Sequence, residues 1–552
     1  MLAFISDNLA LIMFLSLILF LLSGFPVAFS LAANGIFFAL IGMSLDLFHF
    51  SLLQALPDRI FGIMSNSTLL AIPFFTFMGL ILERSGMAED LLDTIGQLFG
   101  PLRGGVAYAV IFVGALLAAT TGIVAASVIS MGLISLPIML KYGYDKKVAT
   151  GVIAASGTLA QIIPPSLVLI VMADQLGRSV GSMYQAAFLP GVLLACLYAL
   201  YIFGLSLVRP KSVPALPPEA RNLRQDNGHS GLISLSLLSL FSLAVAFAFG
   251  HFYALSHPDI ASDRLAIYAG TLGLACSVIS ALLNRHLRLN LLSRLAEKVV
   301  FVLIPPLALI FLVLGTIALA IATPTEGGAM GALGALILAS ISGRLNLQRM
   351  KQALDASARL SCFVMFILLG STFFSLVFRG IHGDSWIEGL LTSLPGGSIG
   401  FLIVVNLLFF TLAFFLDFFE LAFILVPLVG PVAEKLGINL IWFGVLLAVN
   451  MQTSFMHPPF GFALFYLRSV APKEVKTSEI YWGAIPFVLI QIIMVGLIIA
   501  FPALIKLDKE IEQKENLELN ITVPDDDAAP SLDLTTEAPS DDQATHRPAH
   551  TL

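Results

Sequence analysis

Long apolar runs separated by short polar segments recur from the N-terminus to about residue 505. A run of roughly 20 apolar residues crosses the hydrocarbon core of a bilayer as one α-helix. The pattern therefore predicts an all-α polytopic membrane protein. The expected spans are 4–23, 26–47, 67–82, 148–172, 188–208, 232–255, 265–283, 299–322, 327–342, 360–378, 441–466 and 481–505.

Two further apolar stretches, about 107–140 and about 400–432, are too long for one span. Each is interrupted near its middle, so each is either two crossings or one re-entrant hairpin. Lysine and arginine flank the first stretch on both sides, which places both flanks on the cytoplasmic face and permits either arrangement. We favour hairpins because of the chemistry of the interruptions. The same rule places the N-terminus and the C-terminal tail on the opposite, non-cytoplasmic face.

Composition supports this class: 58% of residues are hydrophobic and only 12% are charged. The net charge of −6, without a basic stripe, excludes nucleic-acid binding as a main role. Residues 507–552 carry twelve acidic and three basic side chains, and we expect this acidic tail to be disordered. Catalytic and cofactor signatures are missing, so we predict a protein that is not an enzyme and has no cofactor.

Proline and glycine recur at a constant offset of 294 residues. Because their backbone roles are hard to replace, the agreement indicates an internal repeat. The copies are 1–208 and 299–506, and 209–298 is an inserted linker with two extra spans. The basic loops predict opposite orientations for the two copies, an architecture typical of secondary transporters. The matching pairs are Gly86 and Gly380, Pro101 and Pro395, Pro137 and Pro431, Gly143 and Gly437, Pro164 and Pro458, and Pro165 and Pro459.

The first interruption reads Thr120-Thr121-Gly122 and is followed by Ser127. Small residues let a backbone turn sharply, and a helix that starts here points its N–H groups and positive dipole end into a cavity. This pattern favours an anion site. The alternative is a small-residue face for helix packing.

The matched Pro pairs predict two broken helices. Two prolines within a span remove amide donors and free carbonyl oxygens upstream, which suits a hard cation such as Na⁺. The alternative is a structural kink, and His457, beside the second pair, is more typical of a packing residue. The polar residues before the pairs are Ser156-Gly157-Thr158 and Asn450-Met451-Gln452-Thr453-Ser454.

Asp417 and Glu420 interrupt the second long stretch. An ionisable residue inside a membrane segment is expensive and indicates function, so Asp417 is a candidate ligand for a coupling cation. The alternative is that both carboxylates sit at a turn. A similar choice applies to Thr323-Pro324-Thr325-Glu326, where Thr323 is also a plausible helix N-cap with Glu326 in the first turn.

Several of these segments together resemble the large membrane subunit of tripartite ATP-independent periplasmic (TRAP) transporters. The resemblance covers about 20–205 and 299–505. Its motifs occur in family order at 70–74, 133–145, 162–166, 322–326 and 457–461.

The resemblance implies an elevator-type, Na⁺-coupled importer of organic acids in the bacterial inner membrane. It implies two partners, a small four-helix membrane subunit and a periplasmic solute-binding protein. A stand-alone carboxylate symporter or antiporter is the alternative. The first interruption, Thr121-Gly122-Ile123, departs from the family's usual Gly-Ser-Ser. The end of the last motif resembles a subgroup whose substrates include 2-oxo acids and other carboxylates, so we expect a 2-oxo acid or a C4-dicarboxylate.

Carried onto this chain, the resemblance implies Na⁺ ligands and substrate contacts at the tips and helix breaks. The predicted Na⁺ ligands are Thr120, Thr121, Gly122, Ser156, Gly157, Asp417, Asn450 and Thr453. The predicted substrate contacts are Thr121, Ser127, Thr158, Pro164, Pro165, Ser454, Pro458 and Pro459.

Overall fold

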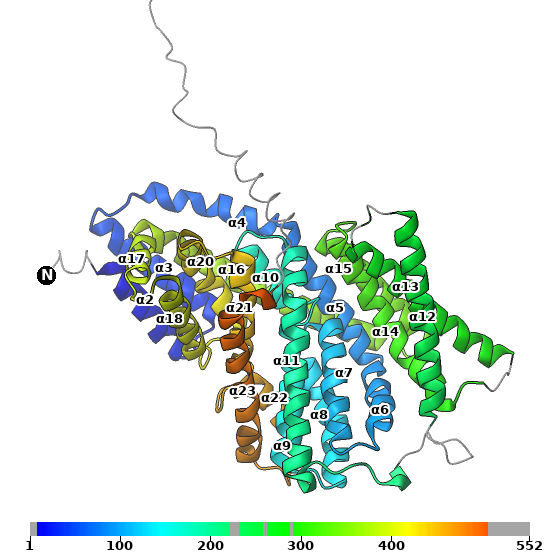
Figure 1. Cartoon of the computed structure of the whole chain (residues 1–552). Coiled ribbons are helices and arrows are strands. Elements are labelled where there is room, and N and C mark those ends of the chain that lie inside the picture. Colours follow the sequence, from blue (N-terminus) through cyan, green and yellow to red (C-terminus); the bar gives the residue numbers. More distant parts are fainter. Residues whose placement is uncertain (1–7, 221–230, 258–259, 261, 288–290, 506–552) are drawn as a thin grey trace, which may run out of the picture. The chain divides into compact units, whose positions relative to one another are not determined.

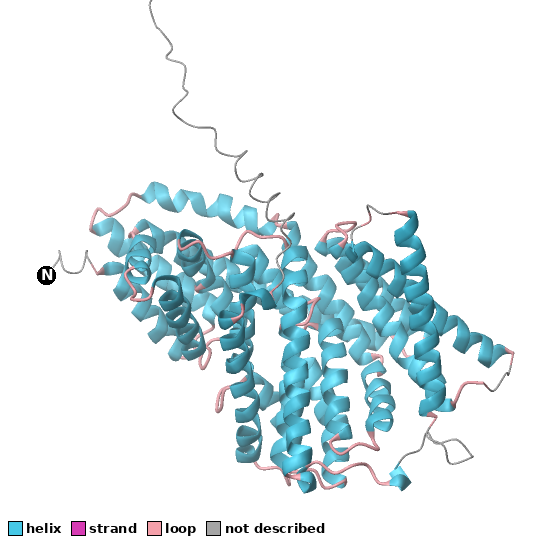
Figure 2. Ribbon diagram, viewed as in Figure 1, coloured by secondary structure: helices cyan, strands magenta, loops and turns pink. Residues whose placement is uncertain are grey.

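The computed structural model describes residues 8–220, 231–257, 260, 262–287 and 291–505. The acidic tail and the first seven residues lie outside this range, so the disorder expected for the tail stays a prediction. In the described part, all regular secondary structure is helical, with loops between the helices and no strand (Figure 2). The all-α fold class predicted from the apolar runs is confirmed.

The helices are named in chain order (Figure 1). Those up to the insertion are α2 (Leu9–Leu22), α3 (Val27–Ser44), α4 (Leu56–Met64), α5 (Ala71–Arg84), α6 (Met87–Phe99), α7 (Gly105–Thr121), α8 (Val124–Lys141), α9 (Lys146–Thr158), α10 (Leu167–Gln175) and α11 (Val180–Val208). The insertion holds α12 (Leu232–Ser256) and α13 (Ser262–His286). After it come α14 (Arg294–Ala318), α15 (Pro324–Ile341), α16 (Leu347–Gly380), α17 (Gly383–Thr392), α18 (Gly397–Leu412), α19 (Phe418–Ile424), α20 (Val426–Lys435), α21 (Leu440–Met451), α22 (Phe462–Val470) and α23 (Thr477–Ala500).

Nine helices in the described residues are long and apolar enough to cross a membrane. The sequence pattern missed three short helices, α4, α6 and α17. Each is amphipathic and has fewer than 14 residues, so none forms an apolar run of membrane length. The pattern also began α16 too late, because that helix already includes the polar segment 347–359.

Helix bounds repeat at the offset seen in the sequence. Shifted by 294, α8 covers the same numbers as α19 and α20 together. The same shift places α9 on α21 and α10 on α22 to within one residue at nearly every end. The opposite membrane orientation of the two copies stays a prediction.

Packing between the copies is reciprocal. By the shift of 294 residues, α15 is the counterpart of α3, and α16 is the counterpart of α5. Helix α3 packs on α16, and in the same way α5 packs on α15, so each helix contacts the counterpart of the other. Thr158 and Gln452, which differ by 294, also touch directly: the Gln452 Nε2 donates to the Thr158 carbonyl oxygen at 2.7 Å. A position that contacts its own counterpart is what a local two-fold relation produces.

The helix starts agree with elementary capping. Thr323 and Glu326 form a reciprocal capping box at the start of α15, with Pro324 in the first turn, so the structural alternative for this motif is correct. Asp145 caps α9 by accepting from the N–H groups of Lys147 and Val148. These polar residues therefore set helix starts.

Loops rich in lysine and arginine meet at one end of the helices. The Gly104 N–H donates to the Val213 carbonyl at 2.9 Å, and the Asp145 N–H donates to that of Ser212 at 3.0 Å. The Lys146 ammonium reaches the Glu474 carbonyl at 2.6 Å. Both ends of the α7–α8 pair therefore lie beside the same loop.

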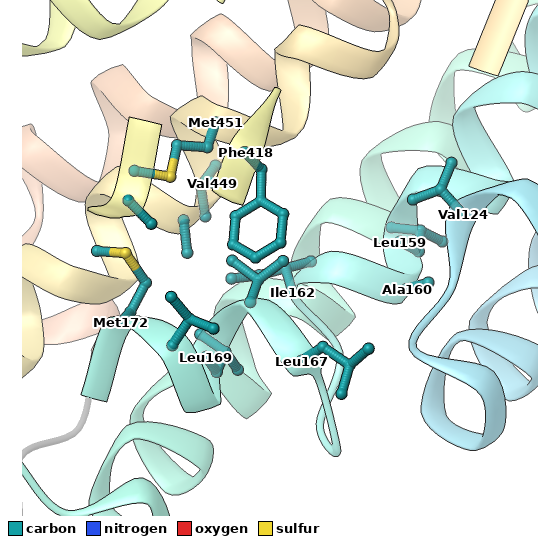
Figure 3. Close-up of a cluster of buried hydrophobic side chains, with 14 of the residues drawn as sticks. Val124, Leu159, Ala160, Ile162, Leu167, Leu169, Met172, Phe418, Val449 and Met451 are labelled. Carbon is teal, nitrogen blue, oxygen red and sulfur yellow. The ribbon is translucent and has the colours of Figure 1, made fainter. Parts of the chain in front are cut away.

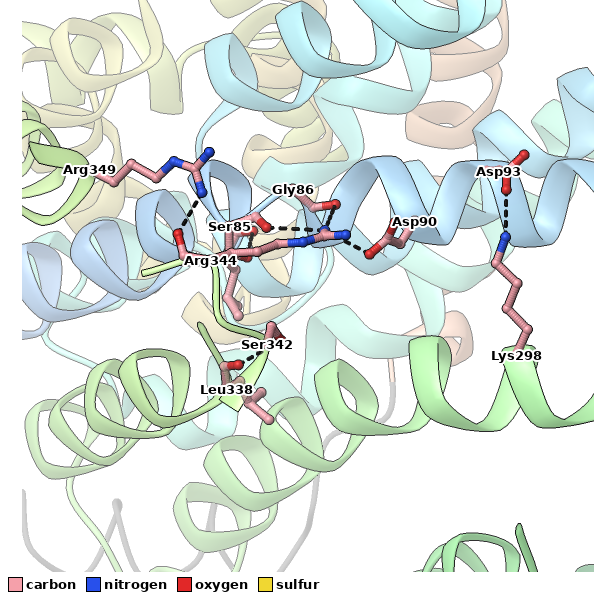
Figure 4. Close-up of polar contacts among 10 residues, drawn as sticks. Ser85, Gly86, Asp90, Asp93, Lys298, Leu338, Ser342, Arg344 and Arg349 are labelled. Carbon is pink, nitrogen blue, oxygen red and sulfur yellow. Dashed lines mark hydrogen bonds and ion pairs between the residues drawn. The ribbon is translucent and has the colours of Figure 1, made fainter. Parts of the chain in front are cut away.

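At another junction Arg344, between α15 and α16, holds the turn between α5 and α6 (Figure 4). Its guanidinium donates to the carbonyl oxygens of Ser85 and Gly86 and lies 2.7 Å from the Asp90 carboxylate. Lys298 pairs with Asp93 at 2.7 Å and joins α14 to α6. These contacts connect the two copies away from the helix breaks.

The inserted helices α12 and α13 pack on one another and on α14. Only 11% of the apolar window of each is buried. A short bond of 2.7 Å between the hydroxyls of Ser242 and Ser277 joins them. Their outer surfaces are free to face lipid, and they contribute no residue to the cavity described below.

Candidate functional site

The first hairpin is formed by α7 and α8, which lie side by side (Figure 1). Its turn is Gly122-Ile123, and Gly122 has a left-handed backbone, with φ of +58°, that ends α7. Atoms of Pro165 and Leu167 lie within 4 Å of where a Gly122 Cβ would stand. The tip therefore rests against the first broken helix. The re-entrant course of this hairpin stays a prediction, because α8 is itself long and apolar enough to cross a membrane.

No side chain caps the start of α8. The first N–H groups of a helix have no partner within the helix, so this end carries donors and a partial positive charge. Ser127 lies one turn further along and is buried. The side chains of Thr120 and Thr121 lie outside what the structure describes.

The second hairpin places α18 before α19 and α20, with the turn at 413–417. Asp417 and Glu420 form a reciprocal capping box at the start of α19. The Glu420 N–H donates to Asp417 Oδ1 at 2.9 Å, and the Asp417 N–H donates to Glu420 Oε2 at 2.9 Å. The expectation that these carboxylates sit at a turn is correct, and each has one oxygen engaged by the backbone.

Both predicted broken helices are broken. Helix α9 ends at Thr158 in a short 3₁₀ turn, and α10 begins at Leu167; α21 ends at Met451 in a similar turn, and α22 begins at Phe462. Non-helical backbone therefore separates two short helices in each copy. The Pro164–Pro165 and Pro458–Pro459 bonds are both cis.

Polar side chains before the breaks are buried. Ser156 lies against Gly114 of α7, and its hydroxyl has no hydrogen-bond partner. Asn450, at the matching position, donates to the carbonyl and the side-chain oxygen of Asn406 on α18, at 2.7 and 2.9 Å. In each copy, the first helix of the hairpin thus contacts the broken helix at the corresponding position, Ser156 in one copy and Asn450 in the other.

The two breaks meet through a group of buried amides and hydroxyls. Thr158 accepts from Gln452 and Gln491, and Gln491 also donates to the Tyr198 hydroxyl at 2.9 Å. Thr453 donates to the Asn450 carbonyl, and Ser454 is buried without a partner for its hydroxyl. Five buried side-chain oxygens in this region accept no bond, those of Ser156, Gln161, Gln452, Ser454 and Gln491.

A cavity of about 770 Å³ lies where the two tips approach the breaks. The first tip contributes Gly122 to Ala125, the second contributes Asp417 to Glu420, and the breaks contribute Gln161 and Phe455. Helices α3 and α16 form the opposite side. Figure 3 shows buried apolar side chains from the starts of α8 and α19 and from both broken helices in one cluster.

Of the predicted ligands, Gly122 and Asp417 line this cavity. The others lie behind it in the breaks or in α8: Ser127, Ser156, Gly157, Thr158, Pro164, Pro165, Asn450, Thr453, Ser454, Pro458 and Pro459. His457 packs between the rings of Phe410 and Phe414, with centroids at 4.4 and 4.1 Å, so the expected packing role is confirmed. The hydrogen bond expected of a buried histidine is not seen, because neither ring nitrogen has a hydrogen-bond partner among the described residues.

Sequence reasoning missed Arg359 and the aromatic residues of the cavity. Arg359 lies within α16, at the end of the polar segment 347–359 that precedes the predicted span 360–378. An arginine next to an apolar helical run was the available signal. The rings come from segments far apart in sequence, so no local pattern marked them.

Hairpin tips, broken helices and a shared interior cavity define a multi-pass membrane permease. Residues 14–504 match the family described as "Tripartite ATP-independent periplasmic transporter, DctM component". The chain therefore belongs to this family, as its motifs predicted.

Named relatives support this assignment. The chain is 27% identical over 451 residues to the C4-dicarboxylate TRAP transporter large permease protein DctM of Pseudomonas aeruginosa, covering 82% of this chain and 88% of the relative. It is 23% identical over 483 residues to the sialic acid TRAP transporter large permease protein SiaM of Vibrio cholerae, covering 87% and 94%. A structure of the Alcanivorax borkumensis YdaH transporter aligns with a TM-score of 0.47 at 15% identity, covering 83% and 90%.

Proposed function

We propose that this chain is the large permease subunit of a Na⁺-coupled TRAP importer of an organic acid in the bacterial inner membrane. The N-terminus and acidic tail lie on the periplasmic face in this proposal. A small four-helix subunit accompanies the chain, and a periplasmic binding protein delivers the acid. The observation that carries the proposal is the cavity shared by both hairpin tips.

The acid's carboxylate belongs near the first tip. The N–H groups at the start of α8 lack a side-chain cap, and Val124 and Ala125 line the cavity. A helix N-terminus favours an anion by charge and by hydrogen bonding. The relatives named for C4-dicarboxylates and sialic acid share this carboxylate chemistry.

Na⁺ belongs near the breaks and the second tip. Hard cations take oxygen ligands, and buried hydroxyl oxygens at Ser156 and Ser454 are unpartnered there. Asp417 adds a carboxylate that faces the cavity. One Na⁺ entering down about 100 mV supplies about 2.3 kcal/mol, which is the energy source in this proposal.

Transport in proteoliposomes tests the proposal. The chain is reconstituted with candidate small-subunit and binding proteins from the same genome, and uptake of radiolabelled acids is measured. We expect uptake only with an inward Na⁺ gradient and the binding protein. Uptake that persists after K⁺ replaces Na⁺ contradicts Na⁺ coupling, and uptake without the binding protein favours a stand-alone symporter.

A further inference from the structure

Aromatic rings dominate the wall of the cavity between the tips. They come from α16, from the start of α19 and from the second break, so three separate parts of the fold converge on one apolar surface. Phe363 meets Phe419 edge-on with centroids 6.3 Å apart, and Phe418 and Phe419 are 4.2 Å apart. The rings from these three parts of the fold are those of Phe363, Phe366, Phe418, Phe419, Phe455 and Phe462.

Charge in the cavity is sparse and nearly balanced. Among its described lining residues Arg359 is the single cation, and it takes part in none of the ion pairs of the described chain. The start of α8 adds about half a positive charge. Asp417 and Glu420, when ionised, oppose this with two negative charges.

This balance suits one carboxylate better than two. A first carboxylate pairs with the Arg359 guanidinium, whose planar donors match a carboxylate in bidentate geometry. In the proposed function the start of α8 also serves this first carboxylate, and Na⁺ serves the acidic pair. A second carboxylate then has no further cationic side chain among the described lining residues and faces aromatic carbon, where an unpaired charge is costly. A polyhydroxylated acid would also bind poorly. Its hydroxyl groups would lose their hydrogen bonds to water and find few polar side chains between the rings to replace them.

We propose that the cavity selects monocarboxylates with a bulky apolar or aromatic body, and that Arg359 binds the carboxylate. This inference rests on the proposed function and names its substrate class. The rings contact the apolar body, and the volume of about 770 Å³ accommodates an aromatic acid with room for Na⁺ and water. Neither the family match nor the relatives' names assign this role to Arg359.

Binding to the purified full-length chain with its small subunit in nanodiscs tests the inference. Calorimetric titrations in NaCl use three probes: 3-phenylpropionate, succinate and the neutral 3-phenylpropionamide. We expect 3-phenylpropionate to bind at least tenfold more tightly than succinate and than the amide. Equal or tighter binding of succinate, or binding of neither acid, overturns the inference.

Variants isolate the guanidinium. Arg359→Gln should weaken 3-phenylpropionate binding at least tenfold and leave binding of the amide unchanged. Arg359→Lys, which keeps the charge, should recover part of the loss, and Lys351→Gln on the same helix should bind as the unaltered chain does. If Arg359→Gln binds the acid normally, Arg359 is not the anchor; a variant that aggregates on gel filtration is replaced by the Lys variant, which must then weaken binding at least threefold.

Uptake separates this inference from the proposed function. Na⁺-driven uptake of succinate but not of 3-phenylpropionate overturns the substrate class and leaves the importer intact. Na⁺-independent uptake of 3-phenylpropionate that requires Arg359 supports the substrate class and contradicts Na⁺ coupling.

Discussion

The two hairpin tips occupy matching positions but start their second helices differently. Position 123 at the first tip is Ile123, and its counterpart 294 residues later is Asp417. The first helix start has no side-chain cap, whereas the second is closed by a reciprocal carboxylate box. In the proposed function, the helix start in the first repeat suits an anion, and the carboxylates in the second suit a cation.

This difference suggests how a duplicated unit acquires two functions. Both tips line the same cavity. In the proposed function, a carboxylate and Na⁺ bound there would lie close enough to stabilise each other's binding. Coupling then follows because each ligand reduces the cost of burying the charge of the other. Substitutions at each tip, and at positions far from both, should therefore differ in their effects on transport and stability.

Capping the first tip should have the largest effect on transport. Ile123→Asp places a carboxylate where it accepts the N–H groups of α8 and repels the acid. Charge-assisted hydrogen bonds are worth about 1.5–3 kcal/mol, so we expect uptake to fall by roughly 10- to 100-fold. Ile123→Asn, a neutral cap, should lose less, and an Asp variant that transports normally contradicts the role of the tip.

Removing charge from the second tip should change the Na⁺ requirement. Asp417→Asn keeps a capping side chain but loses the negative charge. We expect the Na⁺ concentration for half-maximal uptake to rise about tenfold, on the order of 1.4 kcal/mol. Glu434→Gln removes an exposed carboxylate of α20 that does not line the cavity, and it is the control. An unchanged Na⁺ requirement in Asp417→Asn leaves this residue as a helix cap alone.

The contact between the copies should affect stability more than selectivity. Gln452→Leu removes the side-chain donor to the buried Thr158 carbonyl, at a cost of about 1–3 kcal/mol. Thermal unfolding in nanodiscs measures the loss. Gln491→Leu keeps that bond and should be milder, so equal losses from both variants would argue against a special contact between matching positions.

The smallest effect is expected far from both tips. Arg344→Ala removes the contacts to Ser85, Gly86 and Asp90, but the side chains of Arg344 and Asp90 are about 40% exposed. Exposed pairs contribute about 0–1 kcal/mol, so stability should fall slightly. Uptake kinetics should not change, and a large transport defect would show that the periphery is coupled to the cavity.

Much of the fold was predictable because membrane helices follow from apolar runs. The Pro pairs at 164–165 and 458–459 located the breaks, since proline removes a backbone donor wherever it stands. Gly122 marked the first tip for a similar reason. The short amphipathic helices α4, α6 and α17 were missed because their apolar faces are too short to form a run.

The cavity was less predictable. Gly122 and Asp417 stood out because each interrupts an apolar stretch, whereas Phe363 and Phe462 look like ordinary membrane-facing residues. Arg359 resembles a loop cation until α16 is seen to continue through it. Which side chains line a cavity depends on how helices distant in sequence pack together. The local periodicity of apolar residues does not contain this information.

Protection of Cys362 tests the central claim most directly. This cysteine lines the cavity and is exposed, while Cys196 and Cys276 can be replaced by serine. The rate of N-ethylmaleimide labelling is measured with and without Na⁺ and the most tightly bound acid of the binding panel. The account predicts at least fivefold slower labelling with both present, and an unchanged rate would show that the acid binds elsewhere.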